Sequence, residues 1–415
     1  MKRKLLAAFG KVDITPEENV KLRGYPSRDF AVDVATGILD RIYARVLLLD
    51  DGDRRVLIVN VDSCSANEAP DPSGNGSPNY TFPYGTVRNW ASVAGTDEMH
   101  VSLYATHTHG APAYFSDKYV SRITEEIKRI CGRLQPVSVM HGTGTCSIAV
   151  NRRPDLKPNF TLPLDRTMDV LVLESSNGRL LGAIVTAAVH PTVLWNIADR
   201  VTADVVGNAV KRWEEELGDS FVALFFQGFS GDVGPLAGGP KGGEVGDTYF
   251  LVQSLGKLLL SDIRDSLRQL HPIDAAPLVA FKESLTLPTK PGFHVDHKDV
   301  TLMGIRLGEA ALLSASLEVF NGHKAPIQAV SPFKLTIMSG IANGYDGYLP
   351  TREAFEDQLG GYEMNVTPYT AEATSPFQTA AARLLERLYH QDCGEGEEGE
   401  QVSSSGDLEP RPGAR

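Results

Sequence analysis

The stretch HVSLYATHTHG, residues 100–110, decides the predicted fold of this chain. An apolar run of strand-forming residues, 100–105, leads directly into Thr-His-Thr-His-Gly. Residues two apart on a strand face the same side, so we expect His107 and His109 to project together from a strand end. Such a pair favours either one ion held by both imidazoles, or one imidazole on an ion and the other on a substrate. The alternative is an ordinary polar strand terminus.

The pattern of an apolar strand that runs into a polar loop recurs along the chain. Residues 5–9 are interpreted as a first strand, and further strands are expected at 44–49, 56–62, 100–106, 169–174, 181–190, 221–227 and 310–320. Helical patterns cover residues 118–134, 204–217, 249–270 and 371–390. This interleaving predicts an α/β fold with mixed β-sheets flanked by helices.

Composition restricts the class of partner. The chain has 415 residues, 42% of them apolar and 22% charged, which is typical of a globular protein. Its formal net charge is −12 at pH 7, and the last 25 residues, with seven acids and two arginines, contribute −5 of it. An acidic body argues against nucleic acid or an anionic membrane as the main partner. We therefore expect a small-molecule substrate, and a homo-oligomer is compatible with the sequence.

Two further features favour a soluble cytoplasmic protein. The apolar run at residues 5–9 is shorter than the ~7–15 residues of a secretion signal, and no apolar run approaches the ~20 residues that span a bilayer. The chain is thus expected to lack a stable membrane association. Its four cysteines, far apart and without CxxC spacing, fit reduced thiols. They are Cys64, Cys131, Cys146 and Cys393.

Three segments are expected to lie outside the regular layers. Residues 63–84 are rich in Pro, Gly, Ser and Asn, which predicts a long irregular loop that could act as a lid. Residues 234–246 form a second glycine-rich loop. The acidic segment 393–415 has the composition of a disordered tail, which leaves residues 1–392 as one catalytic domain.

Two more strand ends carry candidate site residues. His190 closes the run AAVHP at residues 187–191, where it is either a buried core histidine or part of a site, since α/β enzymes gather catalytic groups at strand ends. The sequence FFQGFSGDVGP at 225–235 is a strand that enters a glycine-rich turn. Its amides could bind an oxyanion, with Asp232 as a candidate catalytic residue, or Asp232 could bond its own turn. The turn lacks the G-x-S-x-G spacing of serine hydrolases.

Taken in order, these motifs resemble the catalytic domain of the neutral ceramidases. The matching segments are residues 10–16, 23–25, 39–45, 105–112, 151–154, 188–191, 203–207, 231–235 and 342–348. The likeness spans about residues 8 to 390. It implies a neutral-ceramidase-like catalytic domain.

The resemblance implies one zinc ion per chain. The residues that resemble the family's zinc ligands are His107, His190, Glu318 and Tyr348. The family usually reads Pro-Gly-Glu where this chain reads Ser-Leu-Glu at 316–318, so Glu309 is a competing choice for the carboxylate. Tyr345 is the alternative for the tyrosine. A set of two imidazoles, a carboxylate and a phenolate suits zinc.

The resemblance also implies roles for residues around the ion. His109 is expected to be a proton carrier or oxyanion partner beside the ion. Tyr362 resembles a tyrosine that polarises the substrate carbonyl, and Arg152 resembles an arginine near the pocket. Asp204 is expected to support His190 from behind.

The departures from the family shape the functional prediction. The family's Gly-Asp-x-Ser-Pro-Asn motif has a catalytic serine, but Gly234 stands at that position here, and Ser230 is a weak substitute. The family's carboxy-terminal immunoglobulin-like domain has no counterpart in the sequence. We therefore expect a zinc-dependent hydrolase that cleaves an amide (N-acyl) bond by attack of metal-bound hydroxide, on a substrate other than membrane ceramide. The alternatives are a zinc hydrolase or lyase acting on a polar, sugar-like substrate, and an inactive scaffold or binding protein.

Overall fold

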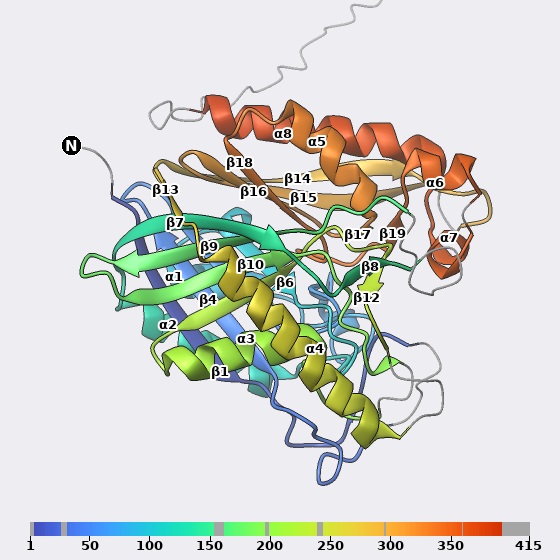
Figure 1. Cartoon of the computed structure of the whole chain (residues 1–415), viewed down its shortest axis with the longest axis horizontal. Coiled ribbons are helices and arrows are strands. Elements are labelled where there is room, and N and C mark those ends of the chain that lie inside the picture. The colour runs from blue at the N-terminus through green and yellow to red at the C-terminus, as the bar shows by residue number, and fades with distance from the viewer. Residues whose placement is uncertain are drawn as a thin grey trace, which may run out of the picture.

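The computed structural model describes residues 4–25, 31–152, 162–195, 199–238, 244–293, 296–358 and 360–391. Within them the chain folds into four layers, with helices, a large sheet, a smaller sheet and further helices in that order (Figure 1). The predicted α/β fold of mixed sheets flanked by helices is confirmed. The predicted tail, 393–415, lies outside the described residues.

The large sheet has nine strands among the described residues and is mixed. In spatial order its strands are β11 (Val222–Gln227), β10 (Leu180–Ala187), β9 (Thr167–Ser175), β7 (Gln135–Thr145), β1 (Leu6–Asp13), β4 (Tyr43–Asp50), β5 (Arg55–Val61) and β6 (Val101–Ala105), and β13 (His271–Ile273) pairs with β7. The pairs β5–β6 and β10–β11 are parallel, and the other pairs are antiparallel.

Alternation along the strands separates the two faces of this sheet. In β4, Ala44, Val46 and Leu48 pack toward the outer helices, whereas Leu47 and Leu49 pack toward the second sheet. This is the period of two that a strand buried on both faces requires. The outer face is covered by α1 (Thr86–Ala94), α2 (Asp117–Cys131), α3 (Asp204–Leu217) and α4 (Val245–Ser266).

The second sheet lies against the inner face of the first (Figure 1). It has the order β14 (Leu278–Pro288), β15 (His297–Leu307), β16 (Ala310–Ala315) and β18 (Leu335–Ser339). Its outer face packs on α5 (Lys324–Val330) and α8 (Thr374–His390). No helix of the described residues is both long and apolar enough to span a bilayer.

Short elements complete the described part of the molecule. They are the strand pairs β2 (Val20–Lys21) with β3 (Ala31–Val32), β8 (Ala149–Asn151) with β12 (Val233–Pro235) and β17 (Glu318–Val319) with β19 (Tyr348–Leu349), the helices α6 (Arg352–Glu356) and α7 (Tyr362–Val366), and the 3-10 turns η1 (Pro72–Gly74), η2 (Glu98–His100), η4 (Asn321–His323) and η5 (Ala371–Ala373). Segment 63–84 is irregular apart from η1, as its composition predicts.

The predicted strand at 310–320 is wrong in one respect, because it is two strands. β16 ends at Ala315, where the backbone N–H of Ser316 donates to the carbonyl of Thr301 and the chain turns out of the sheet. It then forms β17 beside β19, with the Glu318 N–H donating to the Gly347 carbonyl at 2.9 Å. This change of partner brings Glu318 to the interior.

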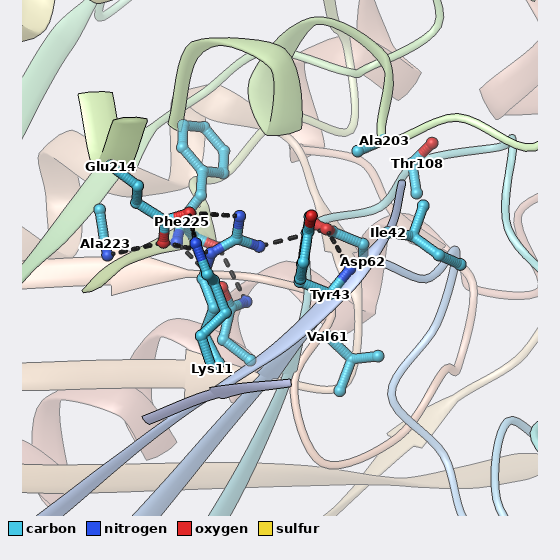
Figure 2. A network of polar contacts seen from close by, with 12 residues as sticks. Lys11, Ile42, Tyr43, Val61, Asp62, Thr108, Ala203, Glu214, Ala223 and Phe225 are labelled. Carbon is cyan, nitrogen blue, oxygen red and sulfur yellow. Dashed lines mark hydrogen bonds and ion pairs between the residues drawn. The ribbon is translucent and has the colours of Figure 1, made fainter. Parts of the chain in front are cut away.

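A buried ion-pair network fastens α3 to the large sheet (Figure 2). The Arg45 guanidinium donates through Nε to Glu214 Oε1 at 2.8 Å and through Nη1 to Asp62 Oδ2 at 3.1 Å. Lys11 reaches Glu214 Oε2 at 3.0 Å from the edge of the network. Asp62 also accepts the Tyr43 N–H at 2.8 Å, which fixes the end of β5. The loop that follows β5 therefore starts from a rigid point.

Candidate metal centre

Three side chains far apart in sequence meet at one point inside the molecule. The Nε2 atoms of His107 and His190 lie 3.1 Å apart, and Oε2 of Glu318 lies 3.2 Å from the first and 2.9 Å from the second. All three side chains are at most 2% exposed. His107 and His190 follow β6 and β10 of the large sheet, and Glu318 begins β17, just after β16 of the second sheet ends.

Both imidazoles are oriented by backbone carbonyls. His107 Nδ1 lies 2.6 Å from the Cys64 carbonyl, and His190 Nδ1 lies 2.8 Å from the Ser230 carbonyl and 3.1 Å from that of Val233. A carbonyl only accepts, so each Nδ1 carries a proton, and each ring in its neutral form would offer the Nε2 lone pair to a metal. Two imidazoles held from behind by backbone carbonyls thus face one carboxylate, as is usual for metal-binding histidines.

The spacing of these atoms fits a zinc ion. With Zn–N distances of about 2.0–2.1 Å, ligand atoms of a tetrahedral site lie about 3.3–3.4 Å apart. The three measured separations, from 2.9 to 3.2 Å, are close to that edge. The cluster of His107, His190 and Glu318 also meets the geometric requirement for a site in which each residue offers one ligand atom.

The electrostatics of the cluster are those of three groups, His107, His190 and Glu318, that share one proton. Burial opposes protonation of His107, but the attraction of Glu318 outweighs it and raises the pKa of His107 to about 10. Burial and the nearby Arg152 charge lower the pKa of His190 to about 4. Burial alone would raise the pKa of Glu318, yet His107 holds it well below its usual value. In the metal-free chain the proton therefore resides on His107.

Local backbone geometry supports this convergence. His107 has a φ of 70°, in the left-handed region that costs a non-glycine residue about 1–3 kcal/mol and is found preferentially at functional sites. Gly231 allows the turn after β11 to approach β17, because a Cβ there would lie 2.5 Å from the Glu318 carbonyl oxygen. The Gly231 N–H donates to the Val319 carbonyl at 2.8 Å.

Both tyrosines considered as a fourth ligand lie beside Glu318. Tyr348 is the pairing partner of Glu318 in the β17–β19 ladder and is buried. Tyr345 donates its hydroxyl to Glu318 Oε1 at 2.6 Å. Burial and the Glu318 charge raise the pKa of both phenols well above the usual value. Tyr348 stays the predicted ligand, and Tyr345 is placed to orient the carboxylate.

His109 lies next to the cluster without joining it. Its ring centroid is 5.0 Å from that of His107 and 6.3 Å from that of His190. The Tyr25 ring packs edge-on against it at 4.7 Å, and Gly24 gives it room, since a Cβ at Gly24 would lie 2.4 Å from the imidazole. This position suits the proton-carrier role that was predicted.

Two other predicted catalytic residues, Arg152 and Tyr362, also lie near the cluster. Arg152 is partly buried and pairs with Glu363, its Nη2 3.0 Å from Oε1. Its charge reaches His190 and Tyr348 closely enough to affect their pKa values. Tyr362 begins α7 and packs edge-on against Tyr348 at 6.1 Å, with 43% of its surface exposed. Tyr362 is thus placed to contact both solvent and the site.

The expected support of the His190 ring by Asp204 is wrong, and the alternative carboxylate Glu309 lies away from the cluster. Asp204 does not contact the His190 ring, because its carboxylate accepts the backbone N–H groups of Val193 at 3.3 Å and Val205 at 2.6 Å. It anchors the loop after His190, whereas carbonyls hold the ring itself. Glu309, the competing carboxylate, lies in the turn between β15 and β16 and pairs with Lys334 at the surface.

The glycine-rich turn is built around the carboxylate of Asp232. Its Oδ2 accepts the Asn151 side-chain amide at 3.1 Å and its Oδ1 accepts the Asn321 N–H at 2.8 Å. These contacts tie the turn to β8 and to the segment after β17. The Ser230 hydroxyl is held by the Gln227 side-chain amide at 2.6 Å. The catalytic role of Asp232 stays a prediction.

Sequence reasoning missed one residue of the site, Cys64. Its sulfur and one ring nitrogen each from His107 and His109 lie within 4.8 Å of one another, and the thiol is buried. The signal that identified the histidines could have found it, because Cys64 lies two residues beyond the apolar strand expected at 56–62.

Comparison with known proteins supports the reading of the motifs. No protein-family model matches the chain. The neutral ceramidase of Pseudomonas aeruginosa is 30% identical over 258 residues, which cover 55% of this chain and 36% of that protein. Neutral ceramidase B of Dictyostelium discoideum is 28% identical over 269 residues, 56% of this chain and 35% of that protein. The chain is thus similar in sequence to the neutral ceramidases over about half of its length.

The fold of a neutral ceramidase accounts for nearly the whole chain. The crystal structure of the Pseudomonas aeruginosa neutral ceramidase superposes with a TM-score of 0.74 at 21% identity, covering 96% of this chain and 77% of that one. A ceramidase complexed with C2 gives a TM-score of 0.73 over 95% of the chain. The sequence matches span about a third of the length of these two curated neutral ceramidases.

Proposed function

We propose that this chain is a zinc-dependent hydrolase that cleaves the amide bond of an N-acyl small molecule other than membrane ceramide. The observation that carries the proposal is the convergence of His107, His190 and Glu318 in a chain similar in sequence to the neutral ceramidases. Their nitrogen and oxygen atoms, with the phenol of Tyr348 beside them, form a donor set suited to zinc. When bound, zinc would supply a Lewis acid that polarises the scissile carbonyl and lowers the pKa of a coordinated water to about 7.

The chain's own residues supply the remaining chemistry. His109 lies beside the cluster and would take the proton of the attacking water and deliver it to the leaving amine. Tyr362 would donate a hydrogen bond to the carbonyl oxygen, which gains charge as the carbon becomes tetrahedral. The Arg152–Glu363 pair would hold α7, and therefore Tyr362, against the site.

The glycine at position 234 motivates a direct attack by water. Gly234 has no hydroxyl, and a Cβ there would lie 3.0 Å from Cδ of Arg152, so the arginine stem packs where a side chain would begin. Ser230 is four residues away, and its hydroxyl is engaged by Gln227. A chain that departs from the ceramidase motif at its serine is also expected to differ in substrate.

Metal analysis and turnover of short N-acyl compounds test the proposal. The purified chain should contain one zinc per molecule and cleave N-acyl substrates in detergent-free buffer, and a chelator should abolish turnover until zinc is restored. His107→Ala should lose both the metal and the activity, whereas Ser230→Ala should retain them. A zinc-free, well-folded preparation, or glycoside cleavage without amide cleavage, would overturn it. Equal inactivity of Ser230→Ala would refute direct attack by water.

A further inference from the structure

The segment from Arg23 to Tyr25 forms one wall of the candidate site. It is fixed to the loop after the two histidines, since the Arg23 N–H donates to the Ala111 carbonyl at 3.1 Å. Gly24 lies against the His109 imidazole, and the Tyr25 ring packs on the same imidazole. The Arg23 guanidinium lies over the Tyr345 ring, 5.4 Å from its centroid. All three consecutive residues thus contact groups of the site.

Only one tyrosine ring separates this guanidinium from the metal-binding carboxylate. Tyr345, on which Arg23 lies, donates its hydroxyl to Glu318 Oε1 at 2.6 Å. A substrate whose carbonyl reaches the cluster therefore has its neighbouring atoms within reach of Arg23.

The loop at 63–84 holds the guanidinium in place by one nitrogen. Nη1 of Arg23 donates to the Asn79 carbonyl at 2.9 Å and more weakly to Asn67 Oδ1 at 3.4 Å. Asn67 is itself anchored, because its Oδ1 accepts from Thr81 Oγ1 at 2.9 Å and its Nδ2 donates to the Asn79 carbonyl at 2.8 Å. The charge is therefore positioned before any substrate binds.

Unlike Arg45 and Arg152, Arg23 has no carboxylate partner among the residues that the structure describes. Arg45 is neutralised by Glu214 and Asp62, and Arg152 by Glu363. The hydrogen bonds of Arg23 to described residues use Nη1 alone, which leaves the edge formed by Nε and Nη2 for another acceptor. That edge matches the two oxygens of a carboxylate or phosphate.

We propose that Arg23 recognises an anionic oxygen group of the substrate, a carboxylate or phosphate, a few bonds from the scissile amide. This inference rests on the proposed function and names its substrate class as anionic N-acyl compounds. Arg23 acts as a specificity-determining residue, since it binds the anion and lies apart from the reacting carbonyl. A charge-assisted bidentate contact of this kind is expected to favour the anion by about 10- to 100-fold.

The experiment compares probes that differ only in charge. Zinc-loaded protein is given N-acylglycine, the corresponding N-acylaminomethyl phosphonate and the neutral N-acylglycinamide, all with one short acyl chain, and kcat/KM is measured. The wild type should prefer at least one anionic probe over the amide by about 10- to 100-fold, and the better anion identifies carboxylate or phosphate-like recognition. Arg23→Gln should reduce that ratio to near 1, and Arg23→Lys should retain part of it, because the charge stays and the planar fork is lost.

Arg88→Gln is the matched control. Arg88 is also a surface-accessible arginine next to a tyrosine ring, but it pairs with Glu98 away from the site, so its loss should leave the ratio unchanged. An unchanged ratio in Arg23→Gln, or an equal change in Arg88→Gln, would overturn the inference while leaving amide hydrolysis intact.

A binding measurement separates this inference from the proposed function. Calorimetry with the same probes on zinc-loaded wild type and Arg23→Gln reports anion recognition whether or not a bond is cleaved. Charge-selective binding that depends on Arg23, without turnover, would support the inference and refute the amide hydrolase. Binding of all probes with equal affinity would refute the inference alone. An effect of Arg23→Gln on thermal stability only would assign the residue to loop anchoring.

Discussion

Gly231→Ala is expected to weaken zinc binding although residue 231 is not a ligand. The new methyl carbon would lie 2.5 Å from the Glu318 carbonyl oxygen, 2.8 Å from a ring carbon of Phe320 and 3.0 Å from the Val319 carbonyl carbon. Two of these atoms are backbone, so the contact cannot be relieved by rotating a side chain. The turn and β17 must therefore move apart by about 0.5 Å or more to relieve the contact. A displacement of that size is about the largest that a preorganised site tolerates.

The displacement has two measurable consequences. Overpacking of this kind costs about 1–3 kcal/mol of unfolding free energy. Because it moves Glu318 relative to the two histidines, zinc affinity should fall by about 10- to 100-fold, as for changes in the support of other metal ligands. Competition with a chromophoric chelator measures the affinity, and urea unfolding of the metal-free chain measures the stability.

Gly246→Ala is the matched control for this substitution. Gly246 lies in the first turn of α4, and a Cβ there would have no neighbour within 4 Å. It should bind zinc like the wild type and be no less stable, since alanine favours a helix. If Gly231→Ala bound zinc with an affinity within threefold of the control's, the close approach would not be what positions Glu318, and the reasoning would be refuted.

Three further outcomes follow from the site and the buried network. Tyr345→Phe removes the hydroxyl that donates to the Glu318 carboxylate and should lower zinc affinity by about tenfold or more in a chelator competition. An unchanged affinity would contradict this. Zinc binding should release protons, because His107, with a pKa of about 10, must become neutral to bind the ion. The apparent zinc affinity should therefore rise with pH up to that value. If the Tyr348 phenol binds as phenolate, calorimetry at pH 6 should show one proton fewer released by Tyr348→Phe than by the wild type. Glu214→Gln should cost about 3–5 kcal/mol of unfolding free energy in urea, since it leaves the buried guanidinium undercompensated. Lys11→Met changes a partner of Glu214 whose side chain is 26% exposed, so it should cost less than about 1 kcal/mol of unfolding free energy. Equal losses for Lys11→Met and Glu214→Gln would contradict this.

The sequence predicted those features that depend on neighbouring residues. His107 and His190 each close a buried strand, and the strand period and the change to polar residues are visible locally. The α/β class followed from the same alternation. What local pattern could not show was that both strand ends lie at one place, because that depends on the order of strands in the sheet.

Of the second sheet, only the strand at 310–320 was predicted, and this limited the reading of the later residues. β14 is continuously buried only over Leu278–Ala280 and carries charged and polar residues beyond them, so its sequence does not resemble a buried strand. The expected continuous strand through Glu318 failed for a similar reason. The exit at Ser316 is fixed by contacts with Thr301 and with the β19 region, which are distant in sequence.

Supporting contacts were the least predictable part of the site. A carboxylate behind the His190 ring was the natural expectation, yet two carbonyls occupy that place and Asp204 bonds backbone N–H groups instead. Backbone acceptors leave no trace in side-chain identity. Arg23 reaches the site through the path of its loop, which the match of residues 23–25 to a family motif did not predict.

The origin of the ligands in both halves of the chain bears on how the protein is made. His107 and Glu318 are 211 residues apart in sequence, and each comes from a different side of the interface between the sheets. A nascent polypeptide leaving the ribosome therefore exposes its two imidazoles long before the carboxylate has been synthesised. The proposed zinc site can therefore be completed only after translation has passed β17, so metal loading would be coupled to the docking of the last-made third of the molecule.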